Sequence, residues 1–375
     1  MRICFICGSL EPGCDGVGDY TRRLAGELIR QGVACRSIAL NERVLTQPLE
    51  EMQTSEGTEL PVLRLPASLS WRERARRAKA WTSEFEPDWV SLQFVPFGFQ
   101  KKGLPFGLSR VVDEIAGPAK RHVMFHELWL GMSSTEPVQH TIIGLLQRYT
   151  IRRLLARLRP LRNHTHCDLY KNRLEDMGAR VAQLPLFGNI PVSKDAHFAK
   201  ESDVVSFAVF GNIHHSAPID AFSDELRNWM EIYNKSITIH FLGKVGGEKH
   251  RWCESLQRQG INVVVHGLLA TERVSEVLQA CDYGLGTTPW LLIQKSGSVA
   301  AMLEHDLPVI CVARDWPLKT GNQQMDIPGI LYYCPGRLGQ ILSVRNKANA
   351  LNLGLIAHQM FTDLNNAKYF LSVVE

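Results

Sequence analysis

The sequence lacks long apolar runs, a strong net charge and a secretory signal. No stretch of its 375 residues approaches the ~18 uninterrupted apolar residues that a membrane-spanning helix needs. Only five apolar or small residues separate Arg2 from Gly8, so we expect no signal peptide and a cytoplasmic protein. The net charge of +4 is too small to indicate nucleic acid as a partner.

Paired metal-binding cysteines are also missing. The nine cysteines are scattered along the chain, and only Cys4 and Cys7 form a C-x-x-C pair, inside an apolar segment that is typical of a strand. No second Cys or His pair lies at the spacing of a zinc site. We therefore expect reduced cysteines, no metal and no cofactor.

What is present is an alternation of strand and helix patterns along the whole chain. Residues 3–6 are typical of a strand, and residues 17–28 then show the helical period of apolar side chains. The segment 185–203 has two prolines, a glycine and no period, which indicates a linker. The pattern predicts an α/β protein with two Rossmann-like domains, 1–185 and 186–345, whose parallel sheets face each other across a cleft.

A polar turn in the second half is a candidate anion site. Lys295, Ser296, Gly297 and Ser298 follow a predicted strand and open a predicted helix. Backbone N–H groups at a helix start lack partners, and with the helix dipole and a lysine they suit a diphosphate. A plain Ser-Gly helix cap explains the same residues equally well.

A Gly-rich turn follows the first strand and includes Gly16, Gly18, Asp19 and Tyr20. The glycines allow either close approach of a ligand or a tight strand-to-helix turn. His126 stands at the carboxyl end of a predicted strand, where sites occur, although a lone histidine is more often structural. His214 and His215 follow Gly211 and Asn212 and either contact a ligand or cap the loop.

The stretch Arg148–Arg162 has six arginines and no acidic residue, interleaved with leucines. It has two interpretations. One is a basic face that contacts anionic lipid headgroups. The other is a solvated helix face that packs on the sheet through its leucines.

Taken in order, these motifs resemble glycosyltransferases of the GT-B fold, in particular family four ("glycosyltransferase group 1"). The resemblance covers nearly the whole chain. It rests on eight segments, namely 16–28, 92–98, 123–129, 209–211, 241–243, 266–268, 280–282 and 307–309.

The resemblance implies transfer of a sugar from a nucleotide-diphosphate donor, with retention and without a metal. It implies that His126 lies near the donor sugar and faces Ser296–Ser298 across the cleft, that Gly16 and Gly18 lie near the phosphates, and that the final helix, 346–375, packs back on the first domain. The further donor-side candidates are Gly211, Asn212, Lys244, Lys295, Ser296, Gly297 and Ser298, and the acceptor-side candidates are Asp19, Tyr20 and Gln93.

The chain also departs from the family. The usual Glu-x7-Glu pair falls on Ile293 and Ala301, Asp306 replaces a glycine, and Asn212 replaces an arginine. Lys244 and Lys295 are our candidates for the missing phosphate charge.

Three functions therefore remain open. The first is a glycosyltransferase with a carbohydrate or lipid-linked acceptor. Weak binding of the Arg148–Arg162 face to the membrane would place this enzyme at the inner face of that membrane. The second is a non-catalytic GT-B domain that binds a sugar nucleotide or a protein partner, as the lost glutamates suggest. The third is a nucleotide-sugar epimerase, which the missing carboxylates disfavour.

Overall fold

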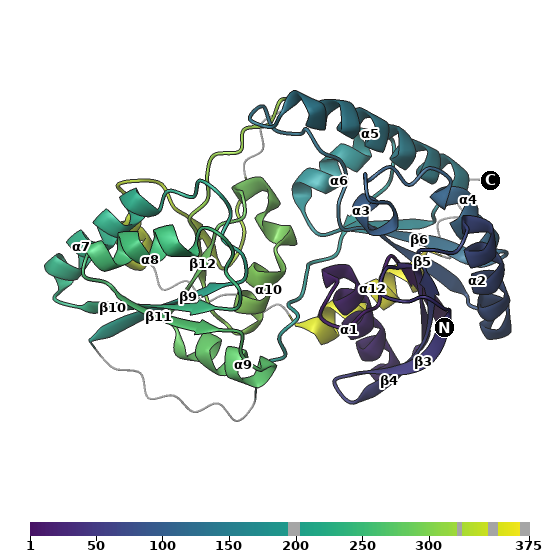
Figure 1. Ribbon diagram of the computed structural model, residues 1–375, viewed down its shortest axis with the longest axis horizontal. Coiled ribbons are helices and arrows are strands. Elements are labelled where there is room, and N and C mark those ends of the chain that lie inside the picture. Colours follow the sequence, from purple (N-terminus) through teal and green to yellow (C-terminus); the bar gives the residue numbers. More distant parts are fainter. Residues whose placement is uncertain (194–202, 321–324, 344–351, 368–375) are drawn as a thin grey trace. The chain divides into compact units, whose positions relative to one another are not determined.

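The computed structural model describes residues 1–193, 203–320, 325–343 and 352–367. It divides into two compact units, each with its own sheet (Figure 1). The N-terminal unit comprises Met1–Pro185, Leu318–Gly321 and Leu353–Glu375, and the C-terminal unit comprises Leu186–Pro317 and Asn322–Asn352.

The sheet of the N-terminal unit has the strand order β3-β4-β2-β1-β5-β6-β7-β8. Every pairing is parallel except β3 with β4, an edge hairpin that the sequence analysis did not anticipate. Its turn is Glu56-Gly57, and both residues have positive φ, as two-residue hairpin turns require. The strands are β1 (Arg2–Cys7), β2 (Ala34–Glu42), β3 (Leu49–Ser55), β4 (Thr58–Pro66), β5 (Trp89–Phe94), β6 (Lys120–Phe125), β7 (Arg162–Thr165) and β8 (Ala182–Gln183).

Helices connect these strands and follow the predicted periods. The Ser70 side chain accepts a hydrogen bond from the Glu73 amide, which caps α2 as its sequence predicts. The short helices α3 and α4 were not predicted. The helices are α1 (Gly16–Arg30), α2 (Trp71–Phe85), α3 (Pro96–Phe99), α4 (Leu108–Ala116), α5 (Val138–Leu158), α6 (Asp168–Glu175) and α12 (Leu353–Asn366).

The C-terminal unit has an all-parallel sheet in the order β11-β10-β9-β12-β13-β14. This is the order of doubly wound nucleotide-binding folds, whose ligands bind where the order reverses, here between β9 and β12. Its elements are β9 (Val204–Phe210), α7 (Ile219–Tyr233), β10 (Ser236–Leu242), α8 (Lys249–Arg258), β11 (Asn262–Gly267), α9 (Thr271–Ala280), β12 (Tyr283–Gly286), the 3₁₀ helix η1 (Trp290–Lys295), α10 (Gly297–Glu304), β13 (Val309–Cys311), β14 (Ile330–Tyr332) and α11 (Leu338–Ser343).

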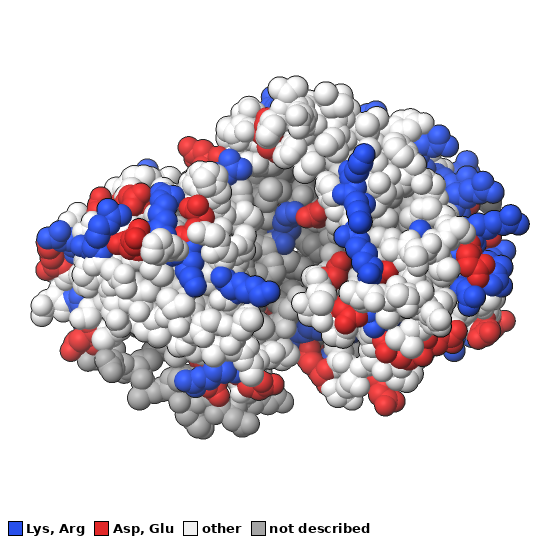
Figure 2. Space-filling view, viewed as in Figure 1, with Lys and Arg blue, Asp and Glu red and all other residues white. Residues whose placement is uncertain are grey.

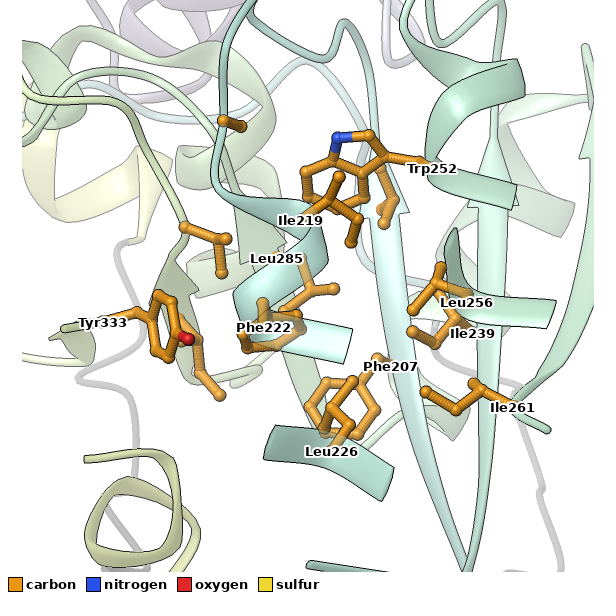
Figure 3. Close-up of a cluster of buried hydrophobic side chains, with 14 of the residues drawn as sticks. Phe207, Ile219, Phe222, Leu226, Ile239, Trp252, Leu256, Ile261, Leu285 and Tyr333 are labelled. Atoms are coloured by element: carbon orange, nitrogen blue, oxygen red, sulfur yellow. The ribbon is translucent and has the colours of Figure 1, made fainter. Parts of the chain in front are cut away.

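Apolar side chains cover both faces of this sheet. Phe207 of β9 packs with Phe222 of α7 and Trp252 of α8 on one face, all fully buried (Figure 3). The next residue, Ala208, points to the opposite face, where α9 and α10 contribute Leu278 and Met302. Burial on both faces explains why every residue of β9 except Ser206 is apolar, rather than every second one.

Candidate functional site

The loop between β1 and α1 is held by buried charges at the carboxyl edge of the N-terminal sheet. The Glu42 carboxylate, at the end of β2, accepts hydrogen bonds from the Leu10 amide at 2.6 Å and the Ser9 hydroxyl at 2.9 Å. Arg64 of β4 donates to Glu42 at 3.0 Å, and both side chains are almost completely buried. Arg64 also pairs with Glu11 and Glu51. Sequence reasoning missed this cluster, because its members come from separate elements.

The start of α1 is capped from within the chain. The Asp15 carboxylate accepts from the Val17 and Gly18 amides, at 2.8 and 3.0 Å. A Cβ at Gly18 would lie 2.4 Å from the Ser9 carbonyl oxygen, whereas a Cβ at Gly16 would meet nothing within 4 Å. The close approach of Ser9 therefore explains why residue 18 is a glycine. At position 16, the other predicted glycine, no neighbouring atom would obstruct a side chain. Asp19 binds the Gly13 amide and Arg22.

A cavity of about 340 Å³ opens beside this loop. It lies at the carboxyl ends of β1, β2 and β5, which is where α/β folds bind ligands. Asn41 helps to shape it by donating from its side chain to the Gly98 carbonyl oxygen at 2.9 Å. The lining includes Asp15, Glu42, Arg43 and the predicted acceptor-side residue Gln93.

His126 lies in a buried group of polar side chains. Its Nε2 is 2.9 Å from Gln93 Oε1, and its Nδ1 is 2.9 Å from His166 Nε2. His166 Nδ1 in turn is 3.0 Å from the Leu184 carbonyl oxygen. The buried Tyr20 ring lies 4.7 Å from the His126 ring, and burial raises the pKa of its phenol. The structure thus joins three predicted residues, Tyr20, Gln93 and His126, and adds His166.

A second buried group continues from Gln93, whose side-chain nitrogen donates to Ser91 Oγ at 2.8 Å. Ser91 Oγ is 2.8 Å from His122 Nδ1, and His122 Nε2 is 2.9 Å from His164 Nδ1. His164 Nε2 reaches Asp363 Oδ2 of α12 at 3.0 Å. Burial holds the pKa of His122 well below its usual value, with the nearby His164 adding to the effect.

In the C-terminal unit, the loops after β9 and β10 meet the start of α10. Gly211 has a φ of 81°, and a Cβ there would lie 3.1 Å from Ser298 Cβ. The Asn212 side-chain oxygen lies against Gly246, where an added Cβ would come within 1.9 Å of it. Gly211, Asn212 and Ser298, all predicted donor-side residues, therefore lie together at the carboxyl edge of the sheet.

Positive charge gathers at the same edge. Burial lowers the pKa of His214, and the positive charges of Lys295 and Arg314 lower it further. The His214 amide also donates to Thr287 Oγ1 at 2.9 Å, in the loop after β12. Arg314 follows β13 and was missed, because nothing local distinguishes it from a surface arginine. Lys244 is exposed in the turn after β10.

One part of the predicted anion site is wrong. The Ser296 amide is not available, because it donates to the Ile293 carbonyl oxygen at 3.0 Å and so closes the 3₁₀ helix η1. The sequence pattern predicts this N–H to be one of the unpaired ones at the helix start. The amides of Gly297 and Ser298 remain the candidates, and the Ser296 and Ser298 hydroxyls lie 3.1 Å apart.

The positions of the missing glutamates are part of the core. Ile293 and Ala301 are both 0% exposed. A Cβ added to Gly188 would come within 2.4 Å of the Ala301 Cα, so this segment packs tightly on α10. Glu304, one helical turn later, accepts from the Gly188 amide at 3.0 Å. A carboxylate at either family position would be buried in this structure, where an unpaired charge is costly.

Among the residues that the structure describes, no group of histidine, cysteine and carboxylate side chains could hold a metal ion. Cys4 and Cys7 are both buried, and burial raises the pKa of Cys4 to about 12. Within the same residues, no helix is long and apolar enough to cross a membrane.

Neither a family model nor a curated protein sequence matches the chain. Solved structures match it over nearly its full length. The structure of HepE of Anabaena in complex with UDP-glucose matches this chain with a TM-score of 0.54 and 14% sequence identity. The match covers 100% of this chain and 100% of that one. The pneumococcal O-GlcNAc transferase GtfA, in complex with UDP and GlcNAc, has a TM-score of 0.56 at 9% identity, covering 98% of this chain and 99% of that one.

A putative UDP-N-acetylglucosamine 2-epimerase from Listeria monocytogenes has a TM-score of 0.55 at 9% identity, covering 98% of this chain and 96% of that one. The chain therefore has the GT-B fold of nucleotide-sugar enzymes, as the sequence motifs indicated. Identities this low show the fold alone. The opposition of His126 and Ser296–Ser298 across a cleft stays a prediction.

Proposed function

We propose that this chain transfers a sugar from a nucleotide-diphosphate sugar to a carbohydrate or lipid-linked acceptor. The observation that carries the proposal is the gathering of Gly211, Ser298, Lys295 and Arg314 at the carboxyl edge of the C-terminal sheet, in a chain of this fold. Cations and helix-start amides are groups that stabilise a departing diphosphate.

The chemistry that fits these groups needs neither a metal nor a protein nucleophile. The acceptor hydroxyl attacks the anomeric carbon on the side of the leaving diphosphate. The bond from that carbon to the diphosphate oxygen breaks, the hydroxyl proton passes to the departing diphosphate, and the configuration at the sugar is retained. In this proposal Lys295, Arg314 and the Gly297 and Ser298 amides balance the developing negative charge. His126 approaches the donor sugar, and the cavity lined by Asp15, Glu42 and Gln93 takes the acceptor.

A donor panel tests this function against the two others. Radiolabelled nucleotide sugars, including those of UDP and GDP, are incubated with candidate acceptors, and products are separated by chromatography. We expect labelled acceptor from one donor. A new epimer of the donor without transfer would identify an epimerase. This outcome is worth testing because one structure of the same fold is that of a putative epimerase from Listeria monocytogenes. Binding without any product, read as a thermal shift, would identify a non-catalytic domain.

We also propose that α5 lets this enzyme contact an anionic membrane at the cytoplasmic face. Its leucines Leu154 and Leu158 are buried, so the packing interpretation is right for that side of the helix. Of the six arginines, Arg148 stacks over the Trp129 ring and Arg162 donates to the Asp363 carbonyl oxygen. Arg153 donates to the Tyr149 hydroxyl and Arg157 pairs with Asp113, so four of the six arginines have partners within the protein.

The outer side of α5 is apolar at its start and basic further on. Val138, Ile142, Leu145 and Tyr149 recur at helical spacing and are 77%, 59%, 58% and 49% exposed. Exposed arginines follow, and Figure 2 shows few charges over the first half of α5 and more Lys and Arg toward its end. An exposed apolar stripe beside exposed arginines suits a surface of anionic lipid.

Sedimentation with vesicles containing anionic lipid, at low salt, tests this contact. We expect the wild-type chain to bind, and Arg152→Gln with Arg153→Gln to weaken binding by roughly 10- to 30-fold, since each basic residue near such a surface contributes about 1 kcal/mol. Ile142→Ser with Leu145→Ser should weaken it as well. Ile232→Ser is the control, because Ile232 of α7 is 75% exposed, more than Ile142 at 59%. Wild-type protein that stays in the supernatant would rule out the contact.

A further inference from the structure

A second cavity of the N-terminal unit, which we call the α4–α5 cavity, is lined by residues of α4 and α5. Its volume is about 360 Å³, which is in the range of small-molecule sites. Phe94, the last residue of β5, is part of its lining, so the cavity lies at the carboxyl edge of the sheet. Three arginines line it, Arg110 of α4 and Arg153 and Arg157 of α5, and none of the lining residues that the structure describes is acidic. The cavity therefore favours an anion.

The acidic residues near these arginines do not cancel their charge. Helix α5 has no acidic residue, and the two of α4, Asp113 and Glu114, do not line the cavity. Asp113 is 3.4 Å from Arg157 Nε, but it also accepts from Arg121 at 3.0 Å, so one carboxylate is shared between two arginines. The α4–α5 cavity therefore keeps a net positive charge.

The arginines also keep donors for an anion. A guanidinium has five N–H donors. Arg153 donates from one terminal nitrogen to the Tyr149 hydroxyl at 3.0 Å, and Arg157 contacts Asp113 through Nε, so each of these contacts engages one nitrogen. Arg153 and Arg157 are four residues apart on α5, a spacing at which like charges repel. A phosphate would offset this repulsion, since guanidinium groups donate pairs of hydrogen bonds to phosphate oxygens.

Exposed aromatic rings lie at the same cavity. Phe106 and Tyr149 are part of the lining and are 55% and 49% exposed. Tyr149 is also the last residue of the exposed apolar stripe of α5 that begins at Val138. An anion among the arginines therefore has apolar surface beside it. This combination suits a phosphate ester of an apolar chain better than free phosphate.

The cavity beside the β1–α1 loop, which is our proposed acceptor cavity, has a different charge. Three of its lining residues are acidic, Glu11, Asp15 and Glu42, against one arginine, Arg43. Arg64, which pairs with Glu11 and Glu42, adds one positive charge, so the carboxylates still outnumber the arginines. An uncharged sugar suits this cavity, whereas a phosphate would be repelled.

We propose that the α4–α5 cavity is a subsite for the phosphate of a lipid-linked acceptor. This inference rests on the proposed function, whose acceptor it specifies. The segment after β5 contributes to both cavities, with residues between 95 and 99 at the acceptor cavity and 105–108 at the α4–α5 cavity. The sugar of the acceptor occupies the first cavity, its phosphate lies between α4 and α5, and its apolar chain follows the exposed stripe of α5.

Calorimetric titration of the full chain with geranyl phosphate tests the subsite in the absence of any sugar donor. Geraniol and inorganic phosphate carry only the chain or only the anion. We expect geranyl phosphate to bind more tightly than either, and Arg110→Gln to weaken its binding roughly tenfold, as loss of a hydrogen bond to a charged group does. Arg153→Gln should have a similar effect, so the test does not depend on one variant. Equal affinities for geranyl phosphate and inorganic phosphate would overturn the lipid-linked ligand.

Arg152→Gln is the matched control. Arg152 is an exposed arginine of α5, next to Arg153 in the sequence, and it does not line the cavity. We expect this variant to bind geranyl phosphate as the wild type does. Equal weakening by Arg152→Gln and Arg110→Gln would show attraction by diffuse surface charge and would overturn the subsite, as would wild-type protein that does not bind geranyl phosphate.

A transfer assay separates the subsite from the proposed function. With a sugar acceptor linked to geranyl diphosphate, Arg110→Gln should raise the KM for the acceptor roughly tenfold and change kcat little, because Arg110 binds the acceptor away from the reacting atoms. Binding of geranyl phosphate by a chain that transfers no sugar would refute the function and leave the subsite. Sugar transfer by a chain that does not bind geranyl phosphate would refute the subsite and leave the function.

Discussion

Replacing Arg64 with methionine is expected to destabilise the protein by about 3–5 kcal/mol, the usual loss when one partner of a buried ion pair is removed. Arg64 is 5% exposed and Glu42 is 0% exposed, so the remaining carboxylate would stay buried without its cation. Glu42 also holds the Ser9 hydroxyl and the Leu10 amide, so the β1–α1 loop should loosen as well. The free energy of unfolding in urea is the measurement.

Arg77→Met is the control, because Arg77 is 43% exposed and its pair with Glu73 lies on the surface of α2. Exposed pairs contribute about 0–1 kcal/mol, so this variant should unfold nearly as the wild type does. Adding Glu42→Gln to Arg64→Met should recover part of the loss, since the buried negative charge is then removed too. Equal stabilities of Arg64→Met and Arg77→Met would mean that Ser9 and Leu10 alone satisfy Glu42.

Replacing Lys295 with alanine is expected to weaken nucleoside diphosphate binding by roughly 10- to 100-fold. Hydrogen bonds to charged groups contribute about 1.5–3 kcal/mol, and 1.4 kcal/mol is one decade of affinity. Lys295 ends η1 beside the start of α10, close enough to His214 to lower the pKa of that ring together with burial and Arg314. Calorimetric titration with UDP and GDP measures the change.

Lys235→Ala is the matched control for Lys295→Ala. Lys235 pairs with Asp203 at 2.9 Å, at the amino ends of β9 and β10, which is the opposite edge of the same sheet. Its removal should leave nucleotide affinity unchanged. If both variants bind with wild-type affinity, Lys295 is a surface charge and the Ser-Gly turn is a plain helix cap.

Several elements follow from local sequence. Ser70 and Glu73 predict the start of α2, and the spacing of Leu24 and Leu28 predicts α1, because capping and helical period depend on residues three or four positions apart. The largely apolar segment 204–210 predicts the strand β9, and the structure shows it buried on both faces. The alternation of such elements is sufficient for the two-domain α/β class.

The sites depend on strand register, which the local pattern does not contain. Ser91 and His122 are direct neighbours in the β5–β6 pairing, and Asp363 reaches His164 only because α12 packs on this unit. His126 was singled out from its place after a strand, yet its partner His166 had no local signal. Arg314 and Lys295 likewise meet His214 from separate loops.

The sequence by itself determined where most strands and helices of this protein lie, because those choices rest on side chains a few positions apart; the β3–β4 hairpin and the short helices α3 and α4 appeared only in the structure. The tertiary structure decided which polar groups meet and which amides remain available, as the closure of η1 by the Ser296 amide shows. Contacts between residues as distant as His164 and Asp363 arise from packing and register, and a single buried charge or hydrogen bond there changes the chemistry of the site without changing the pattern of the chain.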